Sequence, residues 1–298
     1  MPYITSTGAN NKPVQIFYED WGSGKPVILI HGWPVDHSMW EYQMTHLASM
    51  GLRCIAYDRR GFGKSDKPWD GYDYSNLAED LRAIISELDL HDVTLVGFSM
   101  GGGEVIRYCH NHCSARIAKI ILVSSIIPYM MKTDSNPKAV PAEMFDKMEE
   151  QLSNDRPAFL ADFGKTFFGV NWINHPVSHE ILSWMQNLAL QASPKATLAC
   201  MHSFSQTDFR AELASIQVPT LVIHGDMDHT VPIEATGEQA ASSINGATYK
   251  IYPGAPHGLF ITEKEMLSSD IRQFAETGTV ADIIMEPLPF TPQENLYL

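Results

Sequence analysis

The stretch Gly97-Phe98-Ser99-Met100-Gly101 decides how the rest of the chain is interpreted. It follows an apolar, β-branched run at residues 93–96, and a helix-like run begins directly after it. A serine between two glycines at a sharp strand-to-helix turn is the pattern of a nucleophile elbow, because a Cβ at either glycine would clash in so tight a turn. The pattern predicts a serine hydroxyl held clear of a sheet, at the N-terminus of a helix whose free amides can meet an anion.

The bulk composition is that of a globular protein. The chain has 298 residues, of which 44% are hydrophobic and 19% charged, and this length suits one large α/β domain or two small ones. The formal net charge is −14. Because an acidic protein without a basic stripe does not bind polyanions well, neither nucleic acid nor an anionic membrane is expected as a partner.

Targeting and metal-binding patterns are missing from the sequence. The N-terminal residues carry no basic-then-apolar signal pattern, and no apolar run is long enough to span a bilayer, so a cytoplasmic protein is predicted. The scattered cysteines are interpreted as reduced, buried thiols; they are Cys54, Cys109, Cys113 and Cys200. No H-E-x-x-H or Cys/His cluster is present, and neither a metal nor a cofactor is expected.

Apolar runs of strand length alternate with amphipathic segments of helix length along most of the chain. Strands are predicted at residues 14–21, 27–30, 53–57, 93–98, 117–123, 218–223 and 248–252, and helices at residues 39–50, 76–88, 102–112, 234–244 and 263–274. Strands that alternate with helices form a mostly parallel sheet with right-handed crossovers. The expected fold class is therefore α/β, with a doubly wound sheet.

The alternation stops between residues 128 and 212, a stretch rich in methionine and aromatic residues whose helix-like pieces are separated by prolines. We interpret residues 128–212 as a helical cap over one end of the sheet, and residues 1–127 and 213–278 as the core. Most of the aromatic side chains are expected to form the cap's own core, but an apolar cap over a nucleophile also forms an apolar pocket. Residues 279–298 are interpreted as a C-terminal tail, either a surface arm or partly an added tag.

The serine needs a base within hydrogen-bond reach and a third group that orients the base. Among 12 histidines, His257 is the best candidate, because it follows the last predicted strand in a loop bracketed by glycine and proline. The acid is Asp226 or Asp228, and their positions alone do not choose between them. His31 and His224 end apolar strands and are interpreted as structural residues that hydrogen-bond neighbouring loops.

Two backbone amides are needed to stabilise the negative charge that develops when a serine attacks a carbonyl. One is predicted at Met100, directly after the serine, and the other at Trp33, in the loop after the strand at residues 27–30. Pro34 has no amide to donate, and it restricts Trp33 to extended backbone geometry. That restriction determines where the carbonyl of Trp33 points.

Several stretches, in order and at suitable spacing, resemble the α/β-hydrolase superfamily over nearly the whole chain. They are residues 31–34, 57–65, 97–105, 207–210, 224–228 and 255–258. More narrowly, the chain is similar to the cofactor-free haloperoxidases, or perhydrolases, and to their relatives the aryl esterases, lactonases and γ-lactamases. The resemblance implies a catalytic triad of Ser99, Asp228 and His257, with the oxyanion amides at Trp33 and Met100.

The resemblance also implies a function. The chain would be a serine hydrolase that forms an acyl-enzyme on Ser99 from a small carboxylic ester or acid. Water would release the acid, and hydrogen peroxide would release a peracid that oxidises halide away from the site, so no haem, metal or flavin is implied. A proline after the oxyanion aromatic, here Pro34, is typical of members with marked perhydrolase activity.

Two alternatives stay open at this point. One is a lactonase or γ-lactamase that uses the same triad, and the other is a ligand-binding receptor that keeps the hydrolase fold. Dehalogenases and epoxide hydrolases are disfavoured, because those relatives have aspartate at the position of Ser99. The alternatives differ in what reaches the serine, which the sequence does not reveal.

The substrate pocket is expected to be largely apolar. Its predicted lining is Trp33, Pro34, Phe98, Ile126, Phe163, Phe168 and Val231. The expected partners are a small-molecule ester or acid and hydrogen peroxide, and a homo-oligomer is left open. Around the acid loop, Met227, His229 and Ile233 depart from the residues that are commoner in the family, and the cap is where substrate choice is expected to reside.

Overall fold

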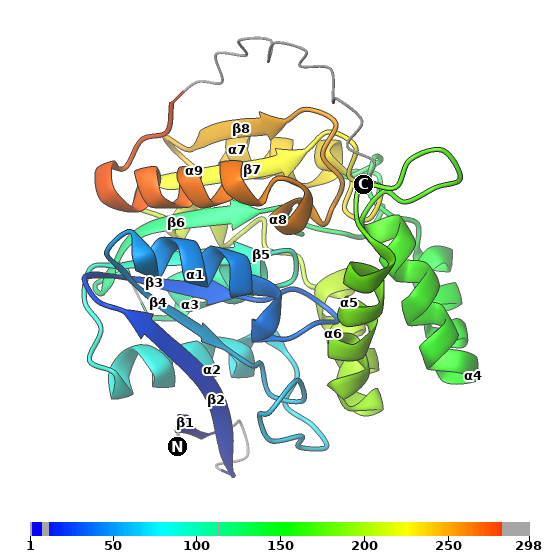
Figure 1. The fold of residues 1–298 in the computed structure, drawn as a ribbon, viewed down its shortest axis with the longest axis horizontal. Coiled ribbons are helices and arrows are strands. Elements are labelled where there is room, and N and C mark those ends of the chain that lie inside the picture. The colour runs from blue at the N-terminus through cyan, green and yellow to red at the C-terminus, as the bar shows by residue number, and fades with distance from the viewer. Residues whose placement is uncertain (1, 8–11, 113, 282–298) are drawn as a thin grey trace, which may run out of the picture.

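The computed structural model describes residues 2–7, 12–112 and 114–281 (Figure 1). Its centre is an eight-stranded sheet with the order β1-β2-β4-β3-β5-β6-β7-β8. The strands from β3 to β8 pair in parallel, whereas β2 pairs antiparallel with both β1 and β4. The interpretation of the C-terminal tail falls mostly on residues 282–298, which lie outside the described residues.

The strands occur where the apolar runs predict them, with one addition. Their bounds are β1 Tyr3–Thr7, β2 Pro13–Gly22, β3 Lys25–Ile30, β4 Leu52–Tyr57, β5 Val93–Phe98, β6 Ile117–Val123, β7 Thr220–Gly225 and β8 Thr248–Tyr252. The addition is β1, a mostly polar edge strand in which only Ile4 and Ser6 are buried. Because such a strand presents one apolar side chain to the core, it carries no hydrophobic pattern that could reveal it.

Helices cover both faces of the sheet. Figure 1 shows α1 (Glu41–Ser49) and α9 (Lys264–Thr277) on one face, and α2 (Tyr74–Glu87), α3 (Gly101–His112) and α7 (Gly237–Ser243) on the other. The predicted helices at 39–50 and 234–244 are each divided, whereas the one at 263–274 falls almost entirely within α9. Shorter helical turns precede α1, α7 and α9. These turns are the 3-10 segments His37–Trp40 and Ile233–Ala235 and the short α8 (Leu259–Thr262).

Two hydrophobic cores lie between the sheet and its helices. In β3, Ile28 and Ile30 point into the core beneath α2 and α3, whereas Val27 and Leu29 point into the core beneath α1 and α9. All four side chains are fully buried. A strand buried on both faces has no polar side, which explains why the sequence shows continuous apolar runs rather than alternation.

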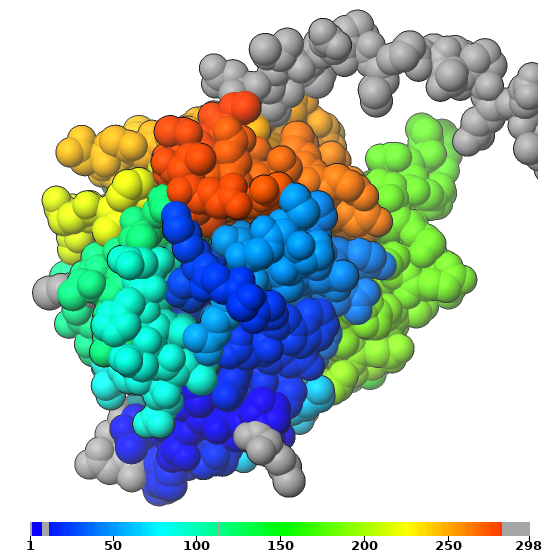
Figure 2. Space-filling view, turned by 60° about the vertical axis from the view of Figure 1, so that its left-hand side comes forward, coloured from blue at the N-terminus to red at the C-terminus, as the bar shows by residue number. Residues whose placement is uncertain are grey.

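Three further helices stand between β6 and β7 in the chain: α4 (Ala142–Phe167), α5 (His179–Gln191) and α6 (Pro194–Gln206). They lie beyond the carboxyl ends of the parallel strands (Figure 1), and in Figure 2 the same segment, in green, occupies one side of the molecule. Within α4, Asp155 has the non-helical angles φ −148° and ψ 81°, two residues before Pro157. The division of this helix at a proline agrees with the sequence pattern, while the boundaries of a cap stay an interpretation.

Candidate active site

The turn after β5 holds Ser99 in a conformation that its glycine neighbours make accessible. Ser99 has a φ of +53°, in the left-handed region, and its backbone amide donates to the carbonyl oxygen of Val123 at 2.9 Å. A Cβ on Gly97 would come within 2.8 Å of the backbone of the next helix, and one on Gly101 within 2.7 Å of the carbonyl oxygen of Ile30. Both contacts are too short for a real side chain, so the two glycines are what allows α3 to start this close to the sheet.

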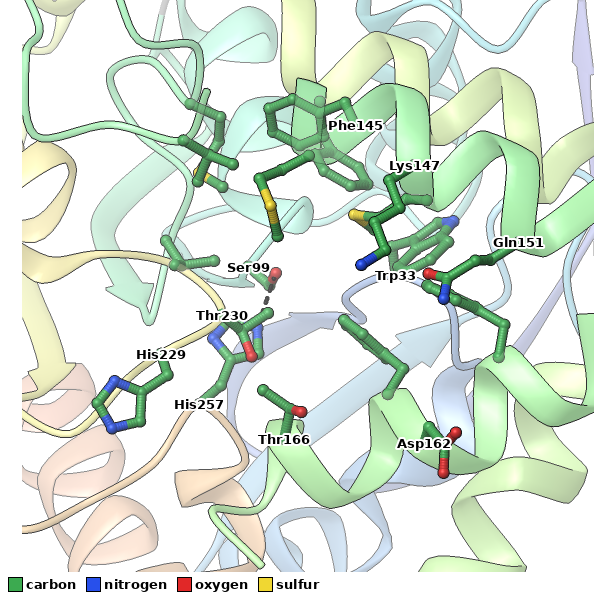
Figure 3. Close-up of a pocket in the computed structure, with 18 of the residues that line it drawn as sticks. Trp33, Ser99, Phe145, Lys147, Gln151, Asp162, Thr166, His229, Thr230 and His257 are labelled. Atoms are coloured by element: carbon green, nitrogen blue, oxygen red, sulfur yellow. Dashed lines mark hydrogen bonds between the residues drawn. The ribbon is translucent and has the colours of Figure 1, made fainter. Parts of the chain in front are cut away.

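A hydrogen-bonded chain runs from Ser99 to a carboxylate. His257 Nε2 lies 3.1 Å from Ser99 Oγ, and His257 Nδ1 lies 2.7 Å from Asp228 Oδ2. The three residues follow β5, β7 and β8, whose carboxyl ends meet at one edge of the sheet (Figure 3 draws the Ser99–His257 contact). Of the two candidate acids, the structure brings Asp228 to the histidine, whereas Asp226 Oδ1 accepts from the amide of Gly254 at 2.6 Å.

The carboxylate of Asp228 is buried but well supplied with donors. Its Oδ1 accepts from the amides of Thr230 and Val231 at 2.9 and 2.8 Å. Burial by itself would raise the pKa of Asp228, but the interactions with His257 and His224 outweigh it and hold the pKa below its ordinary value. The group therefore stays ionised, as a partner for a histidine that gains a proton must.

Aromatic rings hold His257 in place. The ring of Phe167 stands edge-on to the imidazole with centroids 4.7 Å apart, and the ring of Phe98 lies 4.9 Å away. The amide of Gly258 donates to the carbonyl oxygen of Phe167 at 2.8 Å, and a Cβ on Gly258 would come within 2.3 Å of the ring of Phe168. The end of α4 thus supports the histidine loop directly.

The loop after β3 is held by a buried arginine. The amide of Arg59 donates to His31 Nε2 at 2.9 Å, which leaves the proton of this ring on Nδ1, 2.8 Å from the carbonyl oxygen of Gly32. The guanidinium of Arg59 donates to the carbonyl oxygen of His31 at 2.7 Å. Burial and the nearby Arg59 charge hold the pKa of His31 well below its ordinary value, so this ring is a neutral part of the loop's framework.

The same arginine joins the loop to the helix that follows the elbow. Arg59 Nε donates to Glu104 Oε1 at 2.6 Å, and the hydroxyl of Tyr57 donates to Glu104 Oε2 at 2.5 Å. Arg59, Glu104 and Tyr57 are all almost completely buried. Through this network the loop that carries Trp33 has a defined position relative to Ser99.

Two backbone amides beside Ser99 have no acceptor within the part of the chain that the structure describes. Among the described residues, none accepts a hydrogen bond from the amide of Trp33 or from that of Met100. The side chain of Trp33 is tied instead to α6, because its Nε1 donates to the carbonyl oxygen of Thr197 at 2.9 Å. The free amides are those that the sequence predicts for an oxyanion hole.

A cavity of about 700 Å³ opens above Ser99 and His257. Trp33, Ile126, Phe163 and Val231 line it, as the sequence predicts, together with apolar residues that were not predicted: Met130, Val140, Met144, Phe145, Met148, Ala158, Phe159 and Phe204. Most of these come from one face of α4. The signal that could have identified them is the helical spacing of Phe159 and Phe163, whose rings stack at 5.7 Å.

Pro34, Phe98 and Phe168 are absent from the lining of this cavity. Phe98 and Phe168 are fully buried in the core beneath α1 and α9, and Pro34 and Phe168 border a separate small pocket. The cavity lining therefore differs from the predicted one at these three positions, and Phe98 contacts the site from the core, through the ring of His257. For Phe98 the reason is the alternation of side chains along β5, which directs Val96 and Phe98 into the core beneath α1 and α9 and Val93 and Leu95 into the other core.

Polar side chains occur at the outer part of the cavity. Figure 3 shows Lys147 and Gln151 pointing inward from α4, whereas the carboxylate of Asp162 points away. His229 and Thr230 contribute to the lining from the acid loop. The cavity thus combines an apolar inner part with a polar mouth.

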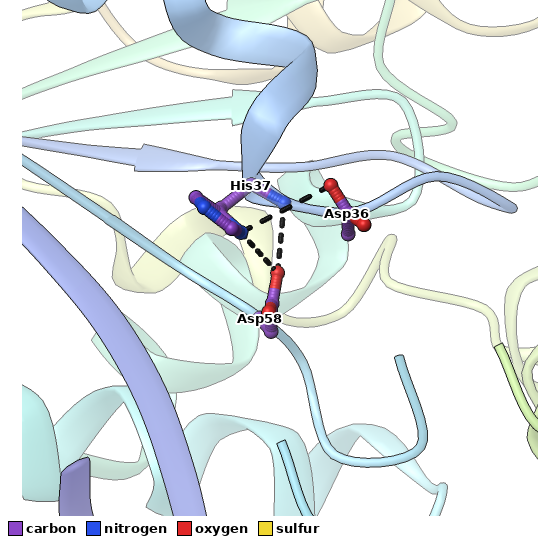
Figure 4. A group of neighbouring side chains, drawn as sticks. All are labelled: Asp36, His37 and Asp58. Carbon is purple, nitrogen blue, oxygen red and sulfur yellow. Dashed lines mark hydrogen bonds and ion pairs between the residues drawn. The ribbon is translucent and has the colours of Figure 1, made fainter. Parts of the chain in front are cut away.

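Among the described residues, one group has the composition of a metal site, namely Asp36, His37 and Asp58 (Figure 4). Its atoms already bind one another: His37 Nδ1 lies 2.6 Å from Asp58 Oδ1, and Asp36 Oδ1 accepts from the amide of Ser38 at 2.9 Å. Asp58 Oδ2 accepts from the amide of Lys64 at 2.7 Å. These contacts fit a structural network that ties loops together, and among the residues that the structure describes no hydrogen bond joins this group to the residues around Ser99.

No helix within the described ranges is long and apolar enough to cross a membrane.

The family model described as the alpha/beta hydrolase fold matches residues 25–264. The chain is 41% identical to a non-heme chloroperoxidase from Kitasatospora aureofaciens, over 88% of this chain and 96% of that one. It is 38% identical to a bifunctional esterase/perhydrolase from Acinetobacter calcoaceticus, over 92% and 99%. The crystal structure of a bromoperoxidase from Bacillus anthracis superposes with a TM-score of 0.88 at 41% identity, over 92% and 99%. The predicted fold class is confirmed, and the chain belongs to the α/β-hydrolase family of enzymes.

Proposed function

We propose that this protein hydrolyses small carboxylic esters through an acyl-enzyme on Ser99, and that hydrogen peroxide can replace water as the acceptor of the acyl group. The observation that carries the proposal is the chain of contacts from Ser99 Oγ through His257 to Asp228, at 3.1 and 2.7 Å, below an apolar cavity. Each member is almost fully buried, which strengthens the electrostatic interactions among them.

In the first half of the reaction, Ser99 Oγ attacks the ester carbonyl while its proton passes to His257 Nε2. The imidazolium that forms is stabilised by the ionised Asp228, 2.7 Å from Nδ1. The amides of Trp33 and Met100 donate hydrogen bonds that stabilise the negative charge on the former carbonyl oxygen. The intermediate then collapses, the bond to the alcohol oxygen breaks, and the alcohol leaves with the proton from His257.

In the second half, water or hydrogen peroxide attacks the acyl-enzyme, and His257 takes the proton from the attacking oxygen. Water yields a carboxylic acid and peroxide yields a peroxycarboxylic acid, and in both cases the proton returns to Ser99. The similarity to a chloroperoxidase and to a bifunctional esterase/perhydrolase supports the peroxide reaction. A lactonase reaction would use the same residues but receives less support from these relatives.

The proposal includes a role for residues 128–212 as a cap over the site. Its support is that α4 supplies much of the cavity lining and that α6 is joined to Trp33 through Thr197. We also propose a cytoplasmic location, in keeping with the free, buried thiols of Cys54, Cys109 and Cys200.

The assignment of Ser99 is tested by Ser99→Ala, with Ser242→Ala as the matched control because Ser242 is exposed and bonds only to its own helix. We expect hydrolysis of p-nitrophenyl acetate to fall by about 10⁴-fold or more in Ser99→Ala and to stay at the wild-type rate in the control. Peracid formation from acetate ester and hydrogen peroxide should be lost in parallel. Wild-type turnover by Ser99→Ala would disprove the proposed mechanism.

A further inference from the structure

A second histidine lies against the carboxylate that orients His257. His224 is the second-last residue of β7, four residues before Asp228, and its side chain is completely buried. Its Nε2 lies 3.0 Å from the carbonyl oxygen of Val231 and 3.2 Å from Asp228 Oδ2. This is the same carboxylate oxygen that His257 contacts.

The position of the proton on His224 follows from its surroundings. Its Nδ1 is buried and has no hydrogen-bond partner among the described residues. Gly237 faces that nitrogen closely, since a Cβ there would come within 2.6 Å of it. A buried N–H without an acceptor is costly, so the ring carries its single proton on Nε2 and directs it toward Val231 and Asp228.

His224 therefore closes a small ring of contacts around the acid loop. The amide of Val231 donates to Asp228 Oδ1 at 2.8 Å, while the carbonyl oxygen of the same residue receives the Nε2 proton of His224. One side of the carboxylate is held by backbone amides, and the other lies between two imidazoles. The direction in which Oδ2 meets His257 depends on this arrangement.

We propose that His224 is a positioning residue for the reaction, which holds Asp228 in the orientation that His257 needs and acts through Asp228 alone. The proposal rests on the proposed function of the triad. It differs from a general structural role, in which His224 would stabilise the fold and its loss would lower activity whether or not Asp228 is present.

The test compares His224→Leu and His224→Gln, each alone and combined with Asp228→Asn. Glutamine can place an N–H near the position of Nε2, whereas leucine removes the donor. We expect kcat/KM for p-nitrophenyl acetate to fall about tenfold or more in His224→Leu, mainly through kcat, with substantial recovery in His224→Gln. In the Asp228→Asn background, which retains residual activity, the leucine substitution should have little further effect.

The separate effects on kcat and KM provide a second readout. His224 is not among the residues that line the cavity above Ser99. Its loss should therefore lower kcat and leave KM near the wild-type value in His224→Leu, with kcat largely recovered in His224→Gln.

Equal losses from His224→Leu in the wild-type and Asp228→Asn backgrounds would overturn the proposal. If the leucine variant does not fold, Gly237→Ala serves in its place, because the added methyl group displaces the ring from the Nδ1 side without changing its chemistry. The same outcomes are then expected of that variant. Failure of the proposed function is recognised separately, since Ser99→Ala would then remain active whatever happens at His224.

Discussion

Single residues determine the chemistry at the centre of this molecule through what their neighbours lack. Ser99 adopts a left-handed backbone, and the missing side chains of Gly97 and Gly101 let the helix begin against the sheet. The same reasoning applies to Gly32, where a Cβ would come within 2.6 Å of the ring of Phe98. At this scale, the sequence pattern and the structure agree closely.

Pro34 does not line the cavity above Ser99, so any effect on the reaction acts through the backbone of its loop. It follows the oxyanion residue Trp33, and proline has no backbone N–H. Residue 34 therefore places no hydrogen-bond donor next to the carbonyl oxygen of Trp33. We expect Pro34→Leu to lower the rate of peracid formation relative to hydrolysis by several-fold, measured as the ratio of peracid to acid from one ester at a given peroxide concentration.

The matched control for Pro34→Leu is Pro137→Leu, a proline in the segment before α4 that is absent from the cavity lining. Its product ratio should equal that of the wild type. An unchanged ratio of peracid to acid in Pro34→Leu would contradict the prediction and would mean that Pro34 affects only the backbone path of its loop.

At the scale of an element, α4 shows how a helix that contains a proline still presents one continuous face. Asp155 leaves the helical conformation, and its Oδ1 accepts from the amide of Ala158 at 3.0 Å. Pro157 then falls in the first turn of the second half, where a missing N–H costs nothing. The two halves together carry Met144 and Met148 and the pair Phe159 and Phe163, all of which line the cavity.

Asp155→Ala removes the cap of the second half of α4. We expect the free energy of unfolding to fall by about 1 kcal/mol, measured by urea denaturation. Asp146→Ala is the control, since this exposed residue lies in the first half of the helix, away from both its N-cap at Pro141 and the kink at Asp155. Equal stabilities of the two variants would show that Pro157 alone is sufficient to start the second half.

At the scale of the whole molecule, a buried ionic network connects the layers. Arg59 follows β4, Glu104 lies in α3, and the carbonyl oxygen of His31 belongs to the loop after β3. Their contacts join the sheet, one helix layer and the oxyanion loop at a single point. The network therefore supports both the fold and the geometry around Ser99.

Glu104→Gln removes the countercharge of Arg59 in a site without solvent. Because an unpaired buried charge is strongly destabilising, we expect a loss of about 3–5 kcal/mol in the free energy of unfolding. The control is Asp20→Asn, which breaks the partly exposed pair with Arg53 and should cost at most about 1 kcal/mol. Similar losses in both variants would contradict this assignment of the network.

The sequence by itself determined the α/β class, the nucleophile elbow and the pair of loops from which the base and the acid come. These features depend on local rules, namely the length of apolar runs and the glycines that a tight turn requires. Position along the chain left Asp226 and Asp228 open and only the resemblance favoured Asp228, whose contact with His257 the tertiary structure supplies. Only the tertiary structure decided that Phe98 turns into the core and that His224 shares the carboxylate. Each of these depends on which atoms approach one another across separate strands, and that proximity is set by the packing of the whole sheet rather than by any stretch of chain.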